Sequence, residues 1–221
     1  MEAYLRPEFL NSLGTVLQGV GTILGALAVC YAGYVGSSTI NKWRTQKLEE
    51  RKIEEAEKIV AAAYNARRHL SYMRSPYIAP QEFAEAERQL VTSGFELSND
   101  PAQRKRLISA QVYYRRFEAS HDKIVDLDAR FPMARALFGD ALEGALEKLG
   151  AQFNVLKAFI DIHAQFNPVA DDIEFGKKIQ AALVRGYPTE DKDEIARTVD
   201  DQIRIIESLC LPVLRLVAGK S

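Results

Sequence analysis

Residues 16–35 read VLQGVGTILGALAVCYAGYV, a run that is almost entirely apolar or small. No Asp, Glu, Lys or Arg lies between Glu8 and Lys42. About 20 residues of this kind suffice to cross the hydrocarbon core of a bilayer, which is about 30 Å thick. The run therefore predicts one transmembrane helix near the N-terminus.

A cleaved signal peptide is the competing interpretation of this run. Ala26 to Ala28 would supply the small residues of a cleavage site, and Leu27 to Cys30 loosely matches a lipoprotein box. However, the basic segment that precedes the apolar part of a signal peptide is nearly absent, and the apolar run continues past Cys30 to Val35. These departures favour a retained transmembrane helix.

Basic residues near the two ends of the run predict its orientation. Arg6 stands alone before it, whereas five basic residues follow it closely, namely Lys42, Arg44, Lys47, Arg51 and Lys52. The positive-inside rule places the more basic end in the cytoplasm. We therefore expect the N-terminus outside, with Lys42, Trp43 and Arg44 as an anchor at the inner membrane interface. Cys30 and Cys210 would then be reduced thiols.

Two stripes of residues follow the predicted span at helical spacing. A seam of small residues can let helix backbones approach closely, and it comprises Gly14, Gly21, Gly25, Ala28 and Ala32. A mildly polar stripe lies beside it and comprises Asn11, Thr15, Gln18, Thr22 and Gly25. The polar groups either form hydrogen bonds between helices or line a water-filled pore. Both interpretations predict a homo-oligomer in the lipid bilayer.

The remainder of the chain has the composition of a water-soluble helical protein. The whole sequence of 221 residues carries 29 Lys plus Arg against 30 Asp plus Glu, a net charge of −1, so binding of nucleic acid by charge alone is unsupported. Residues 41–74 contain no proline or glycine and predict that the span continues as a charged stalk helix. A solvated stalk and a stalk that binds lipid headgroups both fit this charge pattern. An apolar stripe along it, suited to docking on another helix, comprises Ile53, Ala56, Val60, Ala63 and Leu70.

Helical periodicity and capping signals divide the part after the stalk. We expect helices over residues 81–91, 101–130, 140–167 and 171–184 and from 189 onward. Asn99 or Asp100 can cap the second of them, with Pro101 at its first position, and Asp140 with Glu143 makes a capping-box start for the third. Pro212 bends or ends the last helix. The expected inner face of the third helix comprises Leu142, Leu146, Leu149, Phe153, Leu156, Ile160 and His163.

No sustained alternation of period two predicts a strand. The predicted fold class is all-α, with an N-terminal transmembrane helix continuing into a cytoplasmic helical bundle. The predicted parts are 1–41 for the tail and span, 42–75 for the stalk, and 76–221 for the bundle.

The common signatures of catalysis and metal binding are absent from the sequence. It has no GxGxxG, GxxxxGK[ST], HExxH or CxxC pattern and no pair of Glu-x-x-His motifs of the di-iron bundle kind, so we predict no metal and no cofactor. His163 falls within the apolar stripe of its helix, which favours a core histidine over a catalytic one.

One spacing nevertheless matches a catalytic pattern. Residues 116–121 read RFEASH, so that Arg116 and His121 resemble the R-x4-6-H signature of HEPN-type ribonucleases. That resemblance implies that Arg116 would stabilise charge at the scissile phosphate and that His121 would act as general acid or base. It would make RNA a partner and require two protomers for one site. The alternative interpretation is a solvated arginine and a partly buried histidine.

A wider resemblance covers most of the chain. The order of one span, the segment NKWRTQKLEERKIEEAEKIVAAAYNARRHLSYMRSP at 41–76, ARALFG at 134–139 and DDQIRIIESLC at 200–210 is similar to a group of uncharacterised bacterial membrane proteins with helical cytoplasmic domains. The chain also resembles the membrane-anchored HEPN-like accessory proteins of RNA-targeting CRISPR systems, which assemble into ring-shaped pores. The resemblance implies a bacterial inner-membrane protein with a role in antiviral defence.

Three functions are therefore predicted. The first is a self-assembling, single-span membrane protein that forms a pore or depolarises the membrane. The second is a membrane-tethered ribonuclease that uses Arg116 and His121. The third is a passive membrane adaptor for a cytoplasmic protein partner.

Overall fold

The computed structural model describes residues 7–166 and 172–218 of the chain. Every regular element in these two ranges is helical, and no strand occurs in them, so the all-helical class is confirmed. The chain divides into an N-terminal unit, Met1–Arg51, and a helical unit, Lys52–Ser221. Helix α1 (Pro7–Met73) contributes to both. Residues 52–75 of the predicted stalk thus lie in the same compact unit as residues 76–221.

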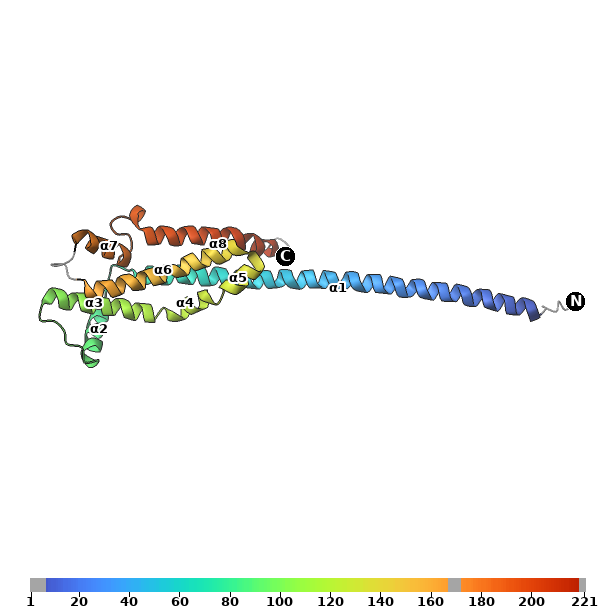
Figure 1. Cartoon of the computed structure of the whole chain (residues 1–221), viewed down its shortest axis with the longest axis horizontal. Helices are drawn as coiled ribbons and strands as arrows, with labels where there is room; N and C mark the ends of the chain where they lie inside the picture. The colour runs from blue at the N-terminus through green and yellow to red at the C-terminus, as the bar shows by residue number, and fades with distance from the viewer. Residues whose placement is uncertain (1–6, 167–171, 219–221) are drawn as a thin grey trace. The chain divides into compact units, whose positions relative to one another are not determined.

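The helical unit is organised around α6 (Asp140–Gln165), which contacts α3 (Pro101–Glu118), α4 (His121–Asp128), α5 (Phe131–Phe138), α7 (Ile173–Leu183) and α8 (Glu194–Ala218). Helices α3 and α8 lie along opposite sides of α6 (Figure 1). The predicted inner face of α6 is confirmed, because Leu142, Leu146, Leu149, Phe153, Leu156 and Ile160 are all buried. Burying one such side chain contributes about 2 kcal/mol to folding.

The C-terminal part of α1 packs into the same core. Ala56, Ala63 and Leu70 of the predicted stripe are buried, and Ile53 and Val60 are partly buried. The buried face is broader than predicted, since it also includes Ile59, Ala62, Ala66 and Met73. A smaller cluster joins α2 (Pro80–Thr92) to α3 through Ala86, Ile108 and Val112.

The single helix predicted over 101–130 was wrong, because α3 ends at Glu118 and α4 and α5 follow as short helices. The interruption lies at Ser120, whose N–H donates to the Phe117 carbonyl at 3.0 Å instead of to Arg116. The Ser120 hydroxyl donates to the Arg116 carbonyl instead, at 2.8 Å. A serine side chain thus replaces a backbone donor and ends the regular ladder.

Two further details of the helix ends differ from the prediction. The N-cap of α6 is Gly139, at φ 87°, and no side chain caps this helix, so the capping box of Asp140 and Glu143 was wrong. Glycine tolerates this positive φ, which turns the chain between α5 and α6. Of the two effects predicted for Pro212, ending the last helix was wrong, because α8 continues to Ala218.

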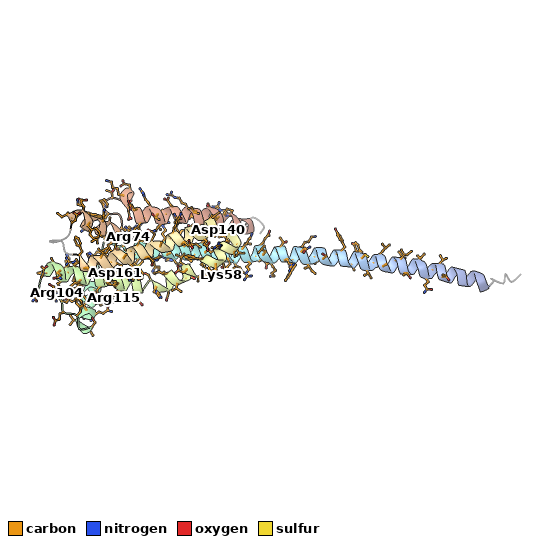
Figure 2. The ribbon with its side chains drawn as sticks, viewed as in Figure 1. Lys58, Arg74, Arg104, Arg115, Asp140 and Asp161 are labelled. Carbon is orange, nitrogen blue, oxygen red and sulfur yellow. The ribbon has the colours of Figure 1, made fainter. Side chains whose placement is uncertain are left out.

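A buried network joins the end of α1 to both α7 and α8. Arg74 is 2% exposed and Asp193 is 1% exposed, and their ion pair measures 2.8 Å (Arg74 is labelled in Figure 2). The Arg74 guanidinium also donates to the carbonyls of Ala182 at 2.7 Å and Ala181 at 2.9 Å. These carbonyls lie in the last turn of α7, where no intrahelical donor is left for them.

The Asp193 carboxylate also accepts hydrogen bonds from two backbone groups. It accepts from the N–H groups of Gly186 at 2.8 Å and Ala196 at 3.0 Å, so it caps the first turn of α8. Burial opposes ionisation of Asp193, but Arg74 and these two N–H groups outweigh burial and lower its pKa. The carboxylate therefore stays charged and the pair is hydrogen-bonded on both sides.

Replacing Arg74 should strongly destabilise the helical unit. In Arg74→Met the Asp193 charge stays buried without its cation, which typically costs about 3–5 kcal/mol. The free energy of unfolding of the full chain in detergent, measured by denaturant titration, checks this. As a matched control, Arg204→Gln removes the exposed Arg204–Asp201 pair and should change stability by less than about 0.5 kcal/mol. Equal effects of the two substitutions would contradict the assigned role of Arg74.

Candidate functional site

The N-terminal unit presents an exposed apolar surface. Its large hydrophobic side chains face outward, with Val29 72% and Tyr34 75% exposed. Helix α1 contains a segment that is long and apolar enough to cross a membrane. In water, an exposed patch of this extent marks a site that contacts lipid or another protein. This surface is the first candidate functional site.

The glycines of this surface face open space within the described part of the chain. A Cβ atom added at Gly14, Gly21 or Gly25 would meet nothing within 4 Å in the described part of the chain, and none of the three has a positive φ. Ala28 and Ala32, the other members of the predicted seam, are exposed on the same helix. Neither backbone conformation nor internal packing therefore requires small residues here.

The polar stripe contains groups in two different states. The Thr22 hydroxyl donates to the Gln18 carbonyl of its own helix at 2.9 Å, so it needs no external partner. The Gln18 side chain is exposed and forms no hydrogen bond with any described residue. Thr15 is also exposed, and the Asn11 side chain lies outside the described residues. Among the members of the stripe whose side chains the structure describes, Gln18 is the one whose polar atoms lack a hydrogen-bond partner.

The predicted interface anchor lies farther along α1. Lys42, Trp43 and Arg44 are all exposed, with Trp43 59% exposed. An aromatic ring flanked by two cations is typical of residues at a membrane interface.

Arg116 and His121 lie in contrasting environments. Arg116 is 3% exposed and forms a two-pronged contact with Glu82, through Nε to Oε1 at 3.1 Å and Nη2 to Oε2 at 2.8 Å. It also donates to the carbonyls of Ser75 at 3.2 Å and Tyr77 at 2.8 Å. Four of its five N–H groups are thus bonded inside the protein. His121, at the start of α4, is exposed.

The surroundings of Arg116 stabilise its charge state and that of its partner. The Arg116 guanidinium lowers the pKa of the Glu82 carboxyl, with help from the N–H of Ala79. The Tyr72 ring lies 5.2 Å from the guanidinium carbon and adds a cation–π contact. Arg116 therefore fastens the segment after α1 onto α2 and α3.

The two other histidines each form a hydrogen bond with a serine, but the donor and the acceptor are the reverse of those in a catalytic pair. Ser120 and Ser109 donate their single hydroxyl hydrogens to the carbonyls of Arg116 and Arg106, at 2.8 Å each. Their contacts with His69 Nδ1 and His163 Nε2, both at 3.0 Å, must therefore be donated by the imidazoles. A general base must accept the serine proton, so neither pair is arranged for nucleophilic catalysis.

Burial controls the titration of His163 and of the buried thiol. Desolvation, with a contribution from Arg106, lowers the pKa of His163 to about 4, so this histidine is neutral near pH 7 as predicted for a core residue. Burial raises the pKa of the Cys210 thiol to about 11, which makes it a poor nucleophile. Among the described residues, no group of three or more His, Cys, Asp or Glu side chains could hold a metal ion.

Comparisons with protein-family models, curated proteins and solved structures give no match for this chain. The candidate sites therefore stand on their own geometry. Sequence reasoning missed the Arg74–Asp193 pair, whose partners are 119 residues apart. It also missed a hollow lined by Arg67, Arg68 and Arg185, of which only the adjacent pair Arg67 and Arg68 gave a sequence signal.

Substitution of Arg116 and His121 should separate a structural role from a catalytic one. Arg116→Lys cannot reproduce the fork to Glu82 and both carbonyl contacts, so we expect a loss of about 2 kcal/mol in the free energy of unfolding. His121→Gln should be neutral within about 0.5 kcal/mol, because the side chain is exposed. Denaturant unfolding and cleavage of single-stranded RNA are measured on both variants. The ribonuclease interpretation instead predicts that cleavage by the wild type is lost equally in both.

Proposed function

We propose that this protein is a single-span membrane protein of the bacterial inner membrane that self-assembles through its span and stalk into a pore-forming effector. The helical unit would be a cytoplasmic bundle held at the membrane by α1. The observation that carries the proposal is the exposed, uncharged and glycine-rich surface of α1, which nothing in the described chain covers.

The length of the uncharged stretch supports insertion into a bilayer. The 33 residues between Glu8 and Lys42 would extend about 50 Å as a helix, well beyond the 30 Å or so of a hydrocarbon core. Exposed apolar surface costs about 25 cal/mol per Å² in water, and lipid removes that cost. The basic cluster that begins at Lys42 supports a cytoplasmic location for the helical unit.

The distribution of small residues supports self-association. A glycine inside a helix costs about 1 kcal/mol relative to alanine, and six glycines lie between residues 14 and 36. Gly14, Gly21 and Gly25 align on one face with Ala28 and Ala32, at steps of three, four and seven residues. Close approach of a second helix along this face would compensate for the cost. Gln18 falls on the same face and could bond to its counterpart in another copy.

The ribonuclease interpretation lacks comparable support, because the contacts of Arg116 are directed at Glu82 and two backbone carbonyls. A guanidinium in these contacts has few donors left for a scissile phosphate. The adaptor interpretation needs no assembly and therefore differs from the proposal in its oligomeric state.

Enlarging the seam should dissociate the oligomer. Gly21→Leu combined with Gly25→Leu keeps the span apolar but separates the helix backbones, so we expect monomers where the wild type forms oligomers. The mass of the detergent-extracted protein, from light scattering, checks this. Gly19→Leu combined with Gly33→Leu is the matched control, because at 3.6 residues per turn both lie off the seam. A wild type that is monomeric in detergent and in lipid would sink the proposal of self-assembly.

A pore further predicts a specific role for Gln18. Wild-type protein in liposomes should release a trapped dye, and Gln18→Leu should reduce that release at least tenfold because the lining loses its unpaired polar group. Thr22→Val should retain release, since the Thr22 hydroxyl is bonded within its own helix. Light scattering on the same samples separates the two roles of Gln18. If dye release is lost while the oligomer stays intact, Gln18 lines the pore. If dye release is lost and the oligomer dissociates, Gln18 forms hydrogen bonds that hold the helices together.

A further inference from the structure

A hollow on the helical unit gathers three arginines. Its volume is about 460 Å³, and Tyr64, Arg67, Arg68, Ser71 and Arg185 line it. The first four belong to one face of α1, and Arg185 lies just after α7. The described lining contains no carboxylate. The hollow is thus surrounded by positive charge and hydroxyl groups.

Only one of the three arginines has its charge neutralised. Arg67 forms an ion pair with Asp200 at 2.8 Å. Arg68 donates to the neutral Asn65 side chain at 2.6 Å. The Arg185 side chain is exposed and forms no ion pair with any described residue. Two guanidinium groups therefore share the hollow without counter-ions, and their mutual repulsion would be relieved by a bound anion.

Two carboxylates lie close to the edge of the hollow, namely Asp200, which pairs with Arg67, and Glu207. The Tyr64 hydroxyl donates to Glu207, and this contact raises the pKa of Tyr64. Tyr64 is therefore a neutral phenol at physiological pH. Glu207 reduces the local positive charge but does not contact either of the unpaired arginines among the described residues.

The backbone around Arg185 is fixed by the buried network. The Arg185 N–H donates to the Arg74 carbonyl at 2.8 Å, and the next N–H, of Gly186, donates to Asp193. Arg185 is thereby held beside the face of α1 that carries Arg67, Arg68 and Ser71. A site whose backbone is already positioned loses less entropy on binding than one on a free loop.

We propose that this hollow binds a phosphate-bearing anion, with Arg68 and Arg185 as its principal ligands. Guanidinium groups form paired hydrogen bonds with phosphate oxygens, and the Ser71 hydroxyl can donate one more. The volume lies in the range of small-molecule sites and exceeds what a bare phosphate needs. The phosphate belongs either to a soluble ligand such as a nucleotide or to a lipid headgroup. All five lining residues lie in the helical unit, so the inference does not depend on the proposed pore.

Titration of the full chain in a zwitterionic detergent tests the soluble source. Pyrophosphate and ATP are the probes, and calorimetry in 150 mM chloride is the readout. We expect saturable binding by the wild type, and Arg68→Gln and Arg185→Gln should each weaken it at least tenfold. Arg88→Gln, an exposed arginine of α2 outside the hollow, is the matched control and should bind like the wild type. Because the substituted residues are exposed, unfolding midpoints should stay unchanged and exclude misfolding.

Vesicle binding tests the lipid source. Binding of the full chain in detergent to vesicles of phosphatidylcholine with and without phosphatidic acid is compared for the same four proteins. A dependence on phosphatidic acid that both hollow variants lose identifies a lipid phosphate. Failure of every probe to bind the wild type, or equal binding by the wild type and both hollow variants, would overturn the proposal. Neither result bears on self-assembly, which is measured separately by mass.

Discussion

The ion pair between Arg74 and Asp193 is the contact on which the arrangement of the helical unit depends. Arg74, the residue just after α1, donates to the open carbonyls at the end of α7. Its partner Asp193 caps the start of α8. Burying two charges carries a desolvation cost of several kcal/mol per ion. The cost is offset here because backbone groups at two helix ends, which would otherwise be unsatisfied, supply the remaining hydrogen bonds. The pair therefore specifies how three helix ends meet.

A second buried guanidinium holds the other side of the same segment. Arg116 donates to the carbonyls of Ser75 and Tyr77, immediately after Arg74. The irregular stretch between α1 and α2 is thus fixed by two arginines from different directions. Because Arg185 donates its N–H to the Arg74 carbonyl, the same network also places the arginine hollow. Stability and the proposed anion site share one set of contacts, which is why the test of the hollow uses the exposed Arg68 and Arg185 and leaves Arg74 intact.

Helical periodicity predicted what depends on local pattern. The inner face of α6 follows from apolar residues three and four apart. Pro101 marked the start of α3 correctly, and of the two candidate caps, Asn99 and Asp100, the Asp100 carboxylate caps it. The break at Ser120 could not be predicted, because it depends on one hydroxyl that binds the Arg116 carbonyl while accepting from His69, a residue 51 positions away. The spacing of Arg116 and His121 likewise carries no information on burial. The same sequence pattern fits a catalytic pair or, as the contacts of Arg116 indicate, an arginine that holds the segment between α1 and α2 in place. Arg74 and Asp193 gave no signal because their pairing exists only in the folded chain.

Glycine provides the sharpest contrast between the two units. In the helical unit, a Cβ at Gly176 would lie 3.1 Å from Phe166, so close packing within the chain explains this glycine. A Cβ at Gly150 would make an ordinary contact with Phe131 at 3.5 Å, and one at Gly144 would meet nothing within 4 Å among the described residues. In the N-terminal unit, a Cβ at any glycine from Gly14 to Gly36 would meet nothing within 4 Å among the described residues. The helical cost of the six glycines from Gly14 to Gly36 is thus not offset by packing within the described part of the chain. A neighbour outside the single chain would supply the compensation. Lipid alone would accept alanine or leucine at these positions equally well, so the aligned small residues favour a second copy of α1 as the neighbour.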